Sequence, residues 1–288
     1  MFRLANSIVR QFTFPIVLSR VAVDGTCTSG IGTYVVINRD GWIVTAYHIV
    51  EQIVNLESEK QLVAAHDTEL ERTKGDQGLQ IKEKQKRIRA LKWPDKKSTR
   101  DFSVWYGRDG AAVAKFAHIK TVDIAVGRLD PFDAASVPSY PTFKDPSKDF
   151  EPGVSLCKLG FPFHEIIPTY DSTAGSFTLP PDAVPLPLFP MDGMLTRMAK
   201  MQVFGAPPAP FPLEFIETSS PGLRGQSGGP TFDSQGTLWG IQVRTAHYPL
   251  GFETGKTEQF LNVGLGVSVA TLLPWFDSLG IGYTLSAY

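Results

Sequence analysis

The chain surrounds a single serine with glycines in the stretch G-L-R-G-Q-S-G-G-P, residues 222–230. Glycine is favoured where the backbone takes unusual angles or approaches another group closely. A serine in such a turn is typical of a nucleophile, because a substrate carbonyl must reach its hydroxyl and backbone N–H groups must surround the oxyanion that forms. We therefore interpret Ser227 as a nucleophile for acyl transfer. The alternative is a glycine-rich turn that happens to contain serine.

A serine hydroxyl also needs a base and a group that orients the base. Among the five histidines, His48 has the most suitable setting, at the end of the strand-like W-I-V-T-A and the start of a helical turn. The orienting acid should be buried, and Asp123 in T-V-D-I-A-V-G-R-L fits, because a carboxylate among apolar residues is costly unless it is paired. The equally weighted alternative is that Asp123 ends a strand or caps a turn. The other histidines lie in a charged segment or near turns: His66, His118, His164 and His247.

The turn around the serine also predicts an oxyanion hole. The backbone N–H groups of Gly225 and Ser227 can point to one spot, with that of Gln226 nearby. Along the chain, the candidate base, orienting acid and nucleophile occur in the order His48, Asp123 and Ser227, which is one of three known chain orders for such triads.

Short strands must position these residues. Apolar β-branched and aromatic runs alternate with glycine turns, and both Asp40-Gly41 and Asp109-Gly110 are hairpin signals between two such runs. The pattern predicts an all-β fold, and the segment 268–280 predicts a closing helix with Ser268 as its N-cap and Gly280 as its C-terminal stop. The N-terminal F-R-L-A-N-S-I-V-R predicts a short helix followed by a strand.

Two segments depart from this β pattern. Residues 51–100 are rich in Glu, Lys, Gln and Arg and predict two charged helices around a turn at Gly75 and Gly78. We favour a solvated helical excursion, and the functional alternative is a lid or a docking arm for a partner. The prolines of residues 179–193, within a longer insert at about 163–192, predict a loop without regular ladder pairing.

Composition narrows the class of protein. The chain has 288 residues, 42% hydrophobic residues and a net charge of −1, so we expect a globular protein that has neither nucleic acid nor a membrane as its main partner. The first 25 residues lack the pattern of a signal peptide, and no apolar run is long enough to span a membrane. The two cysteines, Cys27 and Cys157, are expected to be free thiols. A cytoplasmic location follows as the expectation.

Together these motifs resemble the chymotrypsin-fold, trypsin-like serine proteases, and most closely their HtrA/DegP-like branch. The similar stretches cover most of the chain outside residues 51–100 and 163–192: G-I-G-T-Y-V-V-I-N-R-D-G-W-I-V-T-A-Y-H-I-V, T-V-D-I-A-V-G-R-L, P-G-V-S-L-C-K-L-G-F-P-F, the long segment 215–243 and G-L-G-V-S-V-A-T-L. The resemblance implies two antiparallel six-stranded β-barrels with a C-terminal helix and a helical insertion. We expect residues 1–130 to form the barrel with His48 and Asp123, and residues 131–288 the barrel with Ser227. No PDZ module is expected after the C-terminal helix.

The resemblance further implies a serine endopeptidase that acts on protein or peptide substrates without a metal or an organic cofactor. It places Pro221 at the base of the primary pocket, where no acidic residue stands, so we expect a small to medium apolar P1 residue. Val243 and Thr245 should offer backbone groups to an extended substrate. Arg244 and Arg224 are candidates for contact with acidic groups.

Two other functions compete with this interpretation. A binding or regulatory module with the protease fold would use residues 51–100 to dock a partner, and the same insert could carry a regulatory partner of an active enzyme. An esterase could use the same site, but most serine esterases have a different triad order. Labelling of Ser227 by a covalent serine-hydrolase probe separates the active enzyme from the binding module.

Overall fold

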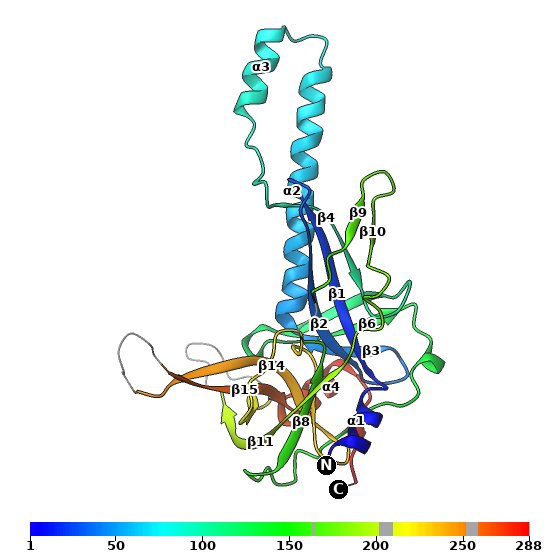
Figure 1. Ribbon diagram of the computed structural model, residues 1–288, viewed down its shortest axis with the longest axis vertical. Coiled ribbons are helices and arrows are strands. Elements are labelled where there is room, and N and C mark those ends of the chain that lie inside the picture. Colours follow the sequence, from blue (N-terminus) through cyan, green and yellow to red (C-terminus); the bar gives the residue numbers. More distant parts are fainter. Residues whose placement is uncertain (163–164, 202–209, 252–258, 288) are drawn as a thin grey trace.

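Two β-sheets, each built mostly of antiparallel strands, make up the body of the protein (Figure 1). The computed structural model describes residues 1–162, 165–201, 210–251 and 259–287. His164, one of the histidines considered above, lies outside the described residues. The two sheets pack side chains into a shared hydrophobic core that contains Ile16, Tyr34 and Val126 from the first sheet and Ile241 and Val267 from the second.

The first sheet has six strands in the order β4-β1-β2-β3-β6-β5. All its neighbouring strands are antiparallel. The strands are β1 (Thr13–Ala22), β2 (Cys27–Val36), β3 (Trp42–Ala46), β4 (Thr99–Trp105), β5 (Ala112–Ile119) and β6 (Ile124–Asp130). The edge strands β4 and β5 do not pair with each other, and both are fully described, so this barrel stays open along one seam.

The second sheet closes into a six-stranded barrel, because β13 pairs with both β8 and β14. Two short strands, β7 and β16, extend the sheet beyond β14 through parallel pairing. The strands are β7 (Thr142–Phe143), β8 (Ser155–Gly160), β11 (Phe189–Lys200), β12 (Glu214–Thr218), β13 (Pro230–Phe232), β14 (Leu238–Pro249), β15 (Phe260–Ser268) and β16 (Thr284–Leu285). The predicted architecture of two antiparallel six-stranded β-barrels is therefore confirmed, with the first barrel open along one seam and two short parallel strands added to the second.

The two Asp-Gly signals have different outcomes. Gly41, with φ of +81°, lies in the turn between the paired strands β2 and β3, and the Asn38 side chain accepts hydrogen bonds from the N–H groups of Asp40 and Trp42. The expected second hairpin around Asp109-Gly110 is wrong. The strands that flank it, β4 and β5, pair with β1 and β6 instead, at opposite edges of the sheet.

In the described ranges, four α-helices accompany the sheets: α1 (Arg3–Val9), α2 (Tyr47–Gly75), α3 (Ile81–Ala90) and α4 (Val269–Leu279). The 3-10 turn η1 (Lys120–Val122) follows the edge strand β5, and the 3-10 turn η2 (Ala134–Ser136) follows β6. Helix α4 begins and ends as predicted. The Ser268 hydroxyl accepts a hydrogen bond from the N–H of Ala270, and Gly280 takes the left-handed conformation that stops the helix.

The charged insert is an arm that rises from the first barrel (Figure 1). The first half of α2 packs against β4, with Leu56 buried and the Glu59 carboxylate accepting hydrogen bonds from the N–H and hydroxyl of Thr99. Beyond this point α2 extends away from the body, and α3, which has no buried residue, lies beside its far end. No helix in the described ranges is both long and apolar enough to cross a membrane.

The proline-rich insert contains more strand than expected. A short hairpin of β9 (Thr169–Asp171) and β10 (Ser176–Thr178) lies within it. Residues 179–188 form no strand, as predicted, but β11 already begins at Phe189 and pairs with β8. Pro190 is compatible with that pairing because it stands at the start of the strand, where a missing N–H does least damage.

Candidate active site

His48 lies where a strand of the first barrel turns into a helix. Strand β3 ends at Ala46, and His48 is the second residue of α2. The Asp123 carboxylate contacts it three times: Oδ2 lies 2.9 Å from His48 Nδ1, Oδ1 lies 3.2 Å from the same nitrogen, and Oδ1 accepts the His48 backbone N–H at 2.9 Å. The Asp123 carbonyl also accepts the N–H of Tyr47 at 3.0 Å. The carboxylate thus fixes both the ring and the backbone of His48.

The sequence interpretation expected Asp123 inside the apolar strand, and the structure places it just before that strand. It caps the 3-10 turn η1 directly before β6, and its φ of 61° is the only positive value at a non-glycine residue in the described ranges. Aspartate tolerates this left-handed conformation better than most residues. The bend turns the carboxylate back to the start of α2, which a residue in regular strand conformation at this position would not do.

The serine turn is clamped against the first barrel. The Thr33 N–H donates to the Ser227 carbonyl at 2.9 Å, and the Thr33 hydroxyl donates to the Gly225 carbonyl at 2.7 Å. Gly228 must be glycine: its φ is +84°, and a Cβ there would lie 2.0 Å from the Thr33 carbonyl oxygen. Sequence reasoning missed Thr33, since nothing in its local pattern distinguishes it from other strand threonines.

Two backbone donors in the turn are available for an oxyanion. The N–H groups of Gly225 and Ser227 have no hydrogen-bond acceptor among the described residues. The N–H of Gln226 donates to the Leu223 carbonyl at 2.9 Å, so it is already used. Of the three residues predicted for the oxyanion hole, two therefore have free donors and the third serves the turn itself.

His48 and Ser227 face each other across one cavity of about 560 Å³. The structure, which describes both residues, shows no hydrogen bond between the Ser227 hydroxyl and the His48 ring. Catalytic hydrogen bonds of this kind are often loose without substrate and tighten when it binds. His48 and Asp123 are thus joined by hydrogen bonds, while Ser227 lines the same cavity without a bond to either.

A second, smaller cavity of about 150 Å³ lies on the other side of Ser227. Its lining includes three residues predicted to bind substrate, Val243, Arg244 and Thr245, and also Gln242, which the prediction missed. The Thr245 hydroxyl accepts the N–H of Gly222 at 2.9 Å and donates to the Gly222 carbonyl at 2.8 Å, which draws the two walls of the cavity together. Val243 is skipped in the pairing of β14 with β15, so its backbone has no ladder partner there.

Pro221 does not line that cavity. Its carbonyl faces the side chain of Lys158, a buried lysine on β8 that is 1% exposed. Lys158 Nζ donates to the carbonyls of Pro221 and Ser220 at 2.8 and 2.5 Å and to the Thr218 hydroxyl at 3.1 Å. Burial lowers the pKa of this amine to about 7. A lysine among the apolar residues of L-C-K-L-G was the only sequence signal for this arrangement.

The remaining candidates are distributed differently. Arg244 donates to the Thr121 carbonyl at 3.2 Å and covers the ring of Phe215, so its guanidinium bridges the two barrels. Arg224 is exposed and lines both cavities. Other histidines make structural contacts: His66 packs on Trp93, His118 stacks on Tyr47 and His247 contacts Asn262.

Several solved structures resemble this chain at low identity. The active form of the Rv3671c protease from M. tuberculosis has a TM-score of 0.49 and 12% identity, over 98% of this chain and 86% of that one. Its inactive form has a TM-score of 0.44 and 13% identity, over 97% and 93% of the two chains. The HtrA-type protease AlgW with a tripeptide has a TM-score of 0.48 and 16% identity, over 97% of this chain and 63% of that one. No curated protein sequence matches the chain.

A family model provides the assignment. The model of the trypsin-like peptidase domain matches residues 32–241, which is more than half of the chain. The matched segment includes His48, Asp123 and Ser227. The chain therefore belongs to the trypsin-like peptidase family, the serine endopeptidases whose substrates are proteins and peptides.

Proposed function

We propose that this protein hydrolyses peptide bonds through an acyl-enzyme formed on Ser227. The observation that carries the proposal is the pairing of His48 Nδ1 with Asp123 Oδ2 at 2.9 Å beside a cavity that also exposes Ser227. With Nδ1 held as the donor to Asp123, Nε2 is the ring nitrogen that faces the serine as a base.

The proposed reaction assigns a defined role to each of these groups. Ser227 Oγ attacks the scissile carbonyl while His48 Nε2 takes the hydroxyl proton, and His48 returns that proton to the leaving amine. Asp123 keeps the ring oriented and stabilises the imidazolium. The N–H groups of Gly225 and Ser227 bind the oxyanion, and each such donor contributes about 3 kcal/mol to the transition state. Water, activated by His48, then releases the acyl group by the reverse sequence.

A small apolar P1 side chain is the proposed primary specificity. The cavity next to Val243 holds about 150 Å³, and the Thr245–Gly222 contact narrows it. Its lining contains no acidic residue, so a P1 lysine or arginine would lose its water without gaining a counter-charge. The backbone of Val243 is not paired with β15, so it can form strand-like hydrogen bonds with the substrate residues before the scissile bond.

A regulatory partner is the second part of the proposal, and the arm supports it. Residues 81–100 carry nine Lys or Arg and two acidic residues, whereas the whole chain has a net charge of −1. Most of these basic side chains are exposed, and so is Trp93. Such a surface fits an acidic protein partner, which would bind along the arm, on the helix α2 whose first turn carries His48. We place this activity in the cytoplasm, in keeping with the free thiols of Cys27 and Cys157.

Labelling with a fluorophosphonate serine-hydrolase probe tests the proposal directly. Purified protein should be labelled and should cleave internally quenched peptides with Ala or Val at P1 faster than peptides with Phe or Lys. Ser227→Ala should lose both labelling and cleavage, with an unchanged unfolding temperature as the control for folding. Labelling that persists in Ser227→Ala would refute the assignment of the nucleophile. Unlabelled wild-type protein that still binds a partner through the arm would favour the binding module.

A further inference from the structure

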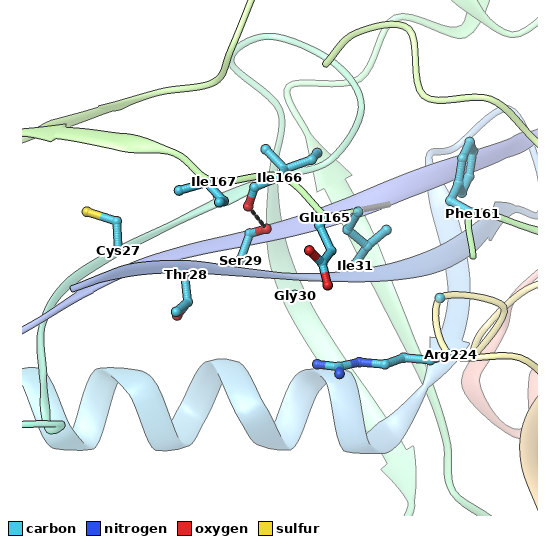
Figure 2. Close-up of a pocket in the computed structure, with 11 residues that line it drawn as sticks. Cys27, Thr28, Ser29, Gly30, Ile31, Phe161, Glu165, Ile166, Ile167 and Arg224 are labelled. Carbon is cyan, nitrogen blue, oxygen red and sulfur yellow. Dashed lines mark hydrogen bonds between the residues drawn. The ribbon is translucent and has the colours of Figure 1, made fainter. Parts of the chain in front are cut away.

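Arg224 is the residue that immediately precedes the oxyanion donor Gly225. It is exposed, and its guanidinium forms no ion pair or hydrogen bond with any described residue. Figure 2 shows its side chain extending between the start of β2 and helix α2. A guanidinium with five N–H donors left to solvent beside a reaction centre is a ready partner for a carboxylate.

The cavities near Arg224 show which part of a substrate it meets. The segment before the scissile bond belongs on the Val243 side of Ser227, where the small cavity lies. The cavity with His48 and Ser227 continues in the opposite direction, along Thr28–Gly32 of β2. Arg224 lines both, at their junction. The residues that follow the scissile bond therefore run past its side chain.

The charge of the cavity that receives the residues after the scissile bond also favours an acidic side chain there. The cavity with His48 and Ser227 is lined by two arginines, Arg20 and Arg224, and by no acidic residue. Arg20 Nε already donates to the Thr28 hydroxyl at 3.1 Å, whereas Arg224 has no such partner among the residues that the structure describes.

A neighbouring cavity of about 590 Å³ extends the same groove past Phe161 and Ile166 (Figure 2). The Ser29 hydroxyl donates to the Ile166 carbonyl and so fixes this wall to β2. The wall is mainly apolar, and its one acidic member, Glu165, lines this cavity together with Arg224, although no ion pair joins the two side chains. Apolar walls limit the water around a bound carboxylate and strengthen its contact with the guanidinium.

From these observations we propose that Arg224 selects substrates with an acidic side chain at the first or second position after the scissile bond. This inference rests on the proposed peptidase function and specifies the substrate residues that follow the scissile bond. Arg244, the other arginine with this potential, is occupied by Thr121 and Phe215 and takes no part.

Paired peptides test this selection. Internally quenched peptides with Ala at P1 carry Glu or its neutral isostere Gln at P1′ or P2′, and kcat/KM is measured for each. The Glu peptide should be preferred about fivefold at one of the two positions, and the preference should fall as salt is added. Arg224→Gln should bring the ratio near one, whereas Arg224→Lys should retain part of it. Arg3→Gln, which removes an exposed arginine on α1, is the matched control and should keep the wild-type ratio.

Binding to the Ser227→Ala protein separates the two proposals. The Kd ratio of the Glu and Gln peptides for this variant, with and without Arg224→Gln, reports on selection whether or not the wild type turns peptides over. Equal cleavage and equal binding of the two peptides, or a preference that survives Arg224→Gln, would overturn the inference and leave the peptidase function standing. Selective binding of the Glu peptide without any cleavage by the wild type would instead support the inference and refute the peptidase function.

Discussion

Lys158 is a cation inside the second barrel, directly behind the segment that leads to the serine turn. Its three acceptors, the Thr218 hydroxyl and the carbonyls of Ser220 and Pro221, surround the ammonium. A Cβ at Gly264 would lie 2.7 Å from Nζ, so the glycine there makes the room that the ammonium occupies. A buried amine whose acceptors are all backbone or hydroxyl oxygens, without a carboxylate, is held in its charged form only weakly.

This lysine gives the protein a specific dependence of stability on pH. The pKa is 10.5 in the unfolded chain and about 7 in the folded protein, so between these values the unfolded state binds more protons. The free energy of unfolding therefore rises with pH in this window, by on the order of 2 kcal/mol between pH 7 and pH 9. Lys158→Met introduces a side chain of similar volume that does not titrate, so the variant should lack this rise in the free energy of unfolding between pH 7 and pH 9. Urea titrations of both proteins at pH 7, 8 and 9 measure the difference.

The prediction is tested by how the difference in free energy of unfolding between wild type and variant changes with pH, and not by the size of that difference at one pH. Lys158→Met also leaves two carbonyls without their donor, and that cost lowers stability equally at every pH. Cysteines and tyrosines that titrate in the same window are common to both proteins and cancel. A difference between wild type and variant that stays constant from pH 7 to pH 9 would mean that the three oxygen acceptors offset burial and that the pKa of Lys158 is ordinary.

The residues that could be found from the sequence are those whose type alone announces chemistry. Ser227 stands among glycines, His48 at the end of an apolar run and Asp123 among apolar residues, in an order known for such triads. Thr33 and Lys158 could not be found in this way. Their importance comes from contacts with residues far along the chain, such as the bond from Thr33 to Gly225, and a threonine or a lysine in a strand carries no local sign of such a contact.

Helix α2 serves two purposes, and its length separates them. Its first turn carries His48, its next turns pack on β4, and its far half forms the arm with α3. The sequence predicted this element well, because its charge and its glycines are local signals. It predicted the hairpin at Asp109-Gly110 wrongly, because the partners of β4 and β5 are chosen by the whole sheet and a turn signal says nothing about them.

Replacement of the far half of the arm should leave the enzyme folded and active. Residues 70–95 would be exchanged for a Gly-Ser linker of about eight residues. The ion pair between Asp67 and Arg100, at 3.3 Å, and the bonds from Glu59 to Thr99 remain to close the base of the arm. We expect the unfolding temperature to change by less than about 3 °C and kcat/KM for short peptides to stay within about twofold.

The same variant measures what the far half of the arm contributes. Its control keeps the length of the arm and neutralises Lys82, Lys86 and Arg89 to glutamine. If both variants keep peptide cleavage but lose stimulation by an acidic partner protein, the basic surface is the docking site. A large loss of stability in the linker variant would instead show that the far half of the arm supports the barrel.

At the scale of the whole molecule, the site exists only where the two barrels meet. His48 and Asp123 belong to the first sheet and its connections, and Ser227 precedes β13 of the second. Thr33 links them at the site, since its N–H donates to the Ser227 carbonyl and its hydroxyl donates to the Gly225 carbonyl. Arg244 adds a bridge to the turn before Asp123. The alignment of Ser227 with His48 is therefore a property of barrel docking.

Thr33→Val tests this dependence, because it removes the hydroxyl and preserves the shape of the side chain. Among the described residues, the Gly225 carbonyl then keeps only the Phe161 N–H, at 3.3 Å, so the peptide that lies between the two proposed oxyanion donors, the N–H groups of Gly225 and Ser227, loses its main anchor. We expect kcat to fall about tenfold while KM changes little, since the donor acts mainly in the transition state, and stability to fall by about 1 kcal/mol. Thr33→Ser keeps the hydroxyl and should retain most of kcat. If serine and valine lower kcat equally, packing rather than the hydrogen bond aligns the barrels, and a loss confined to KM would place Thr33 in substrate binding instead.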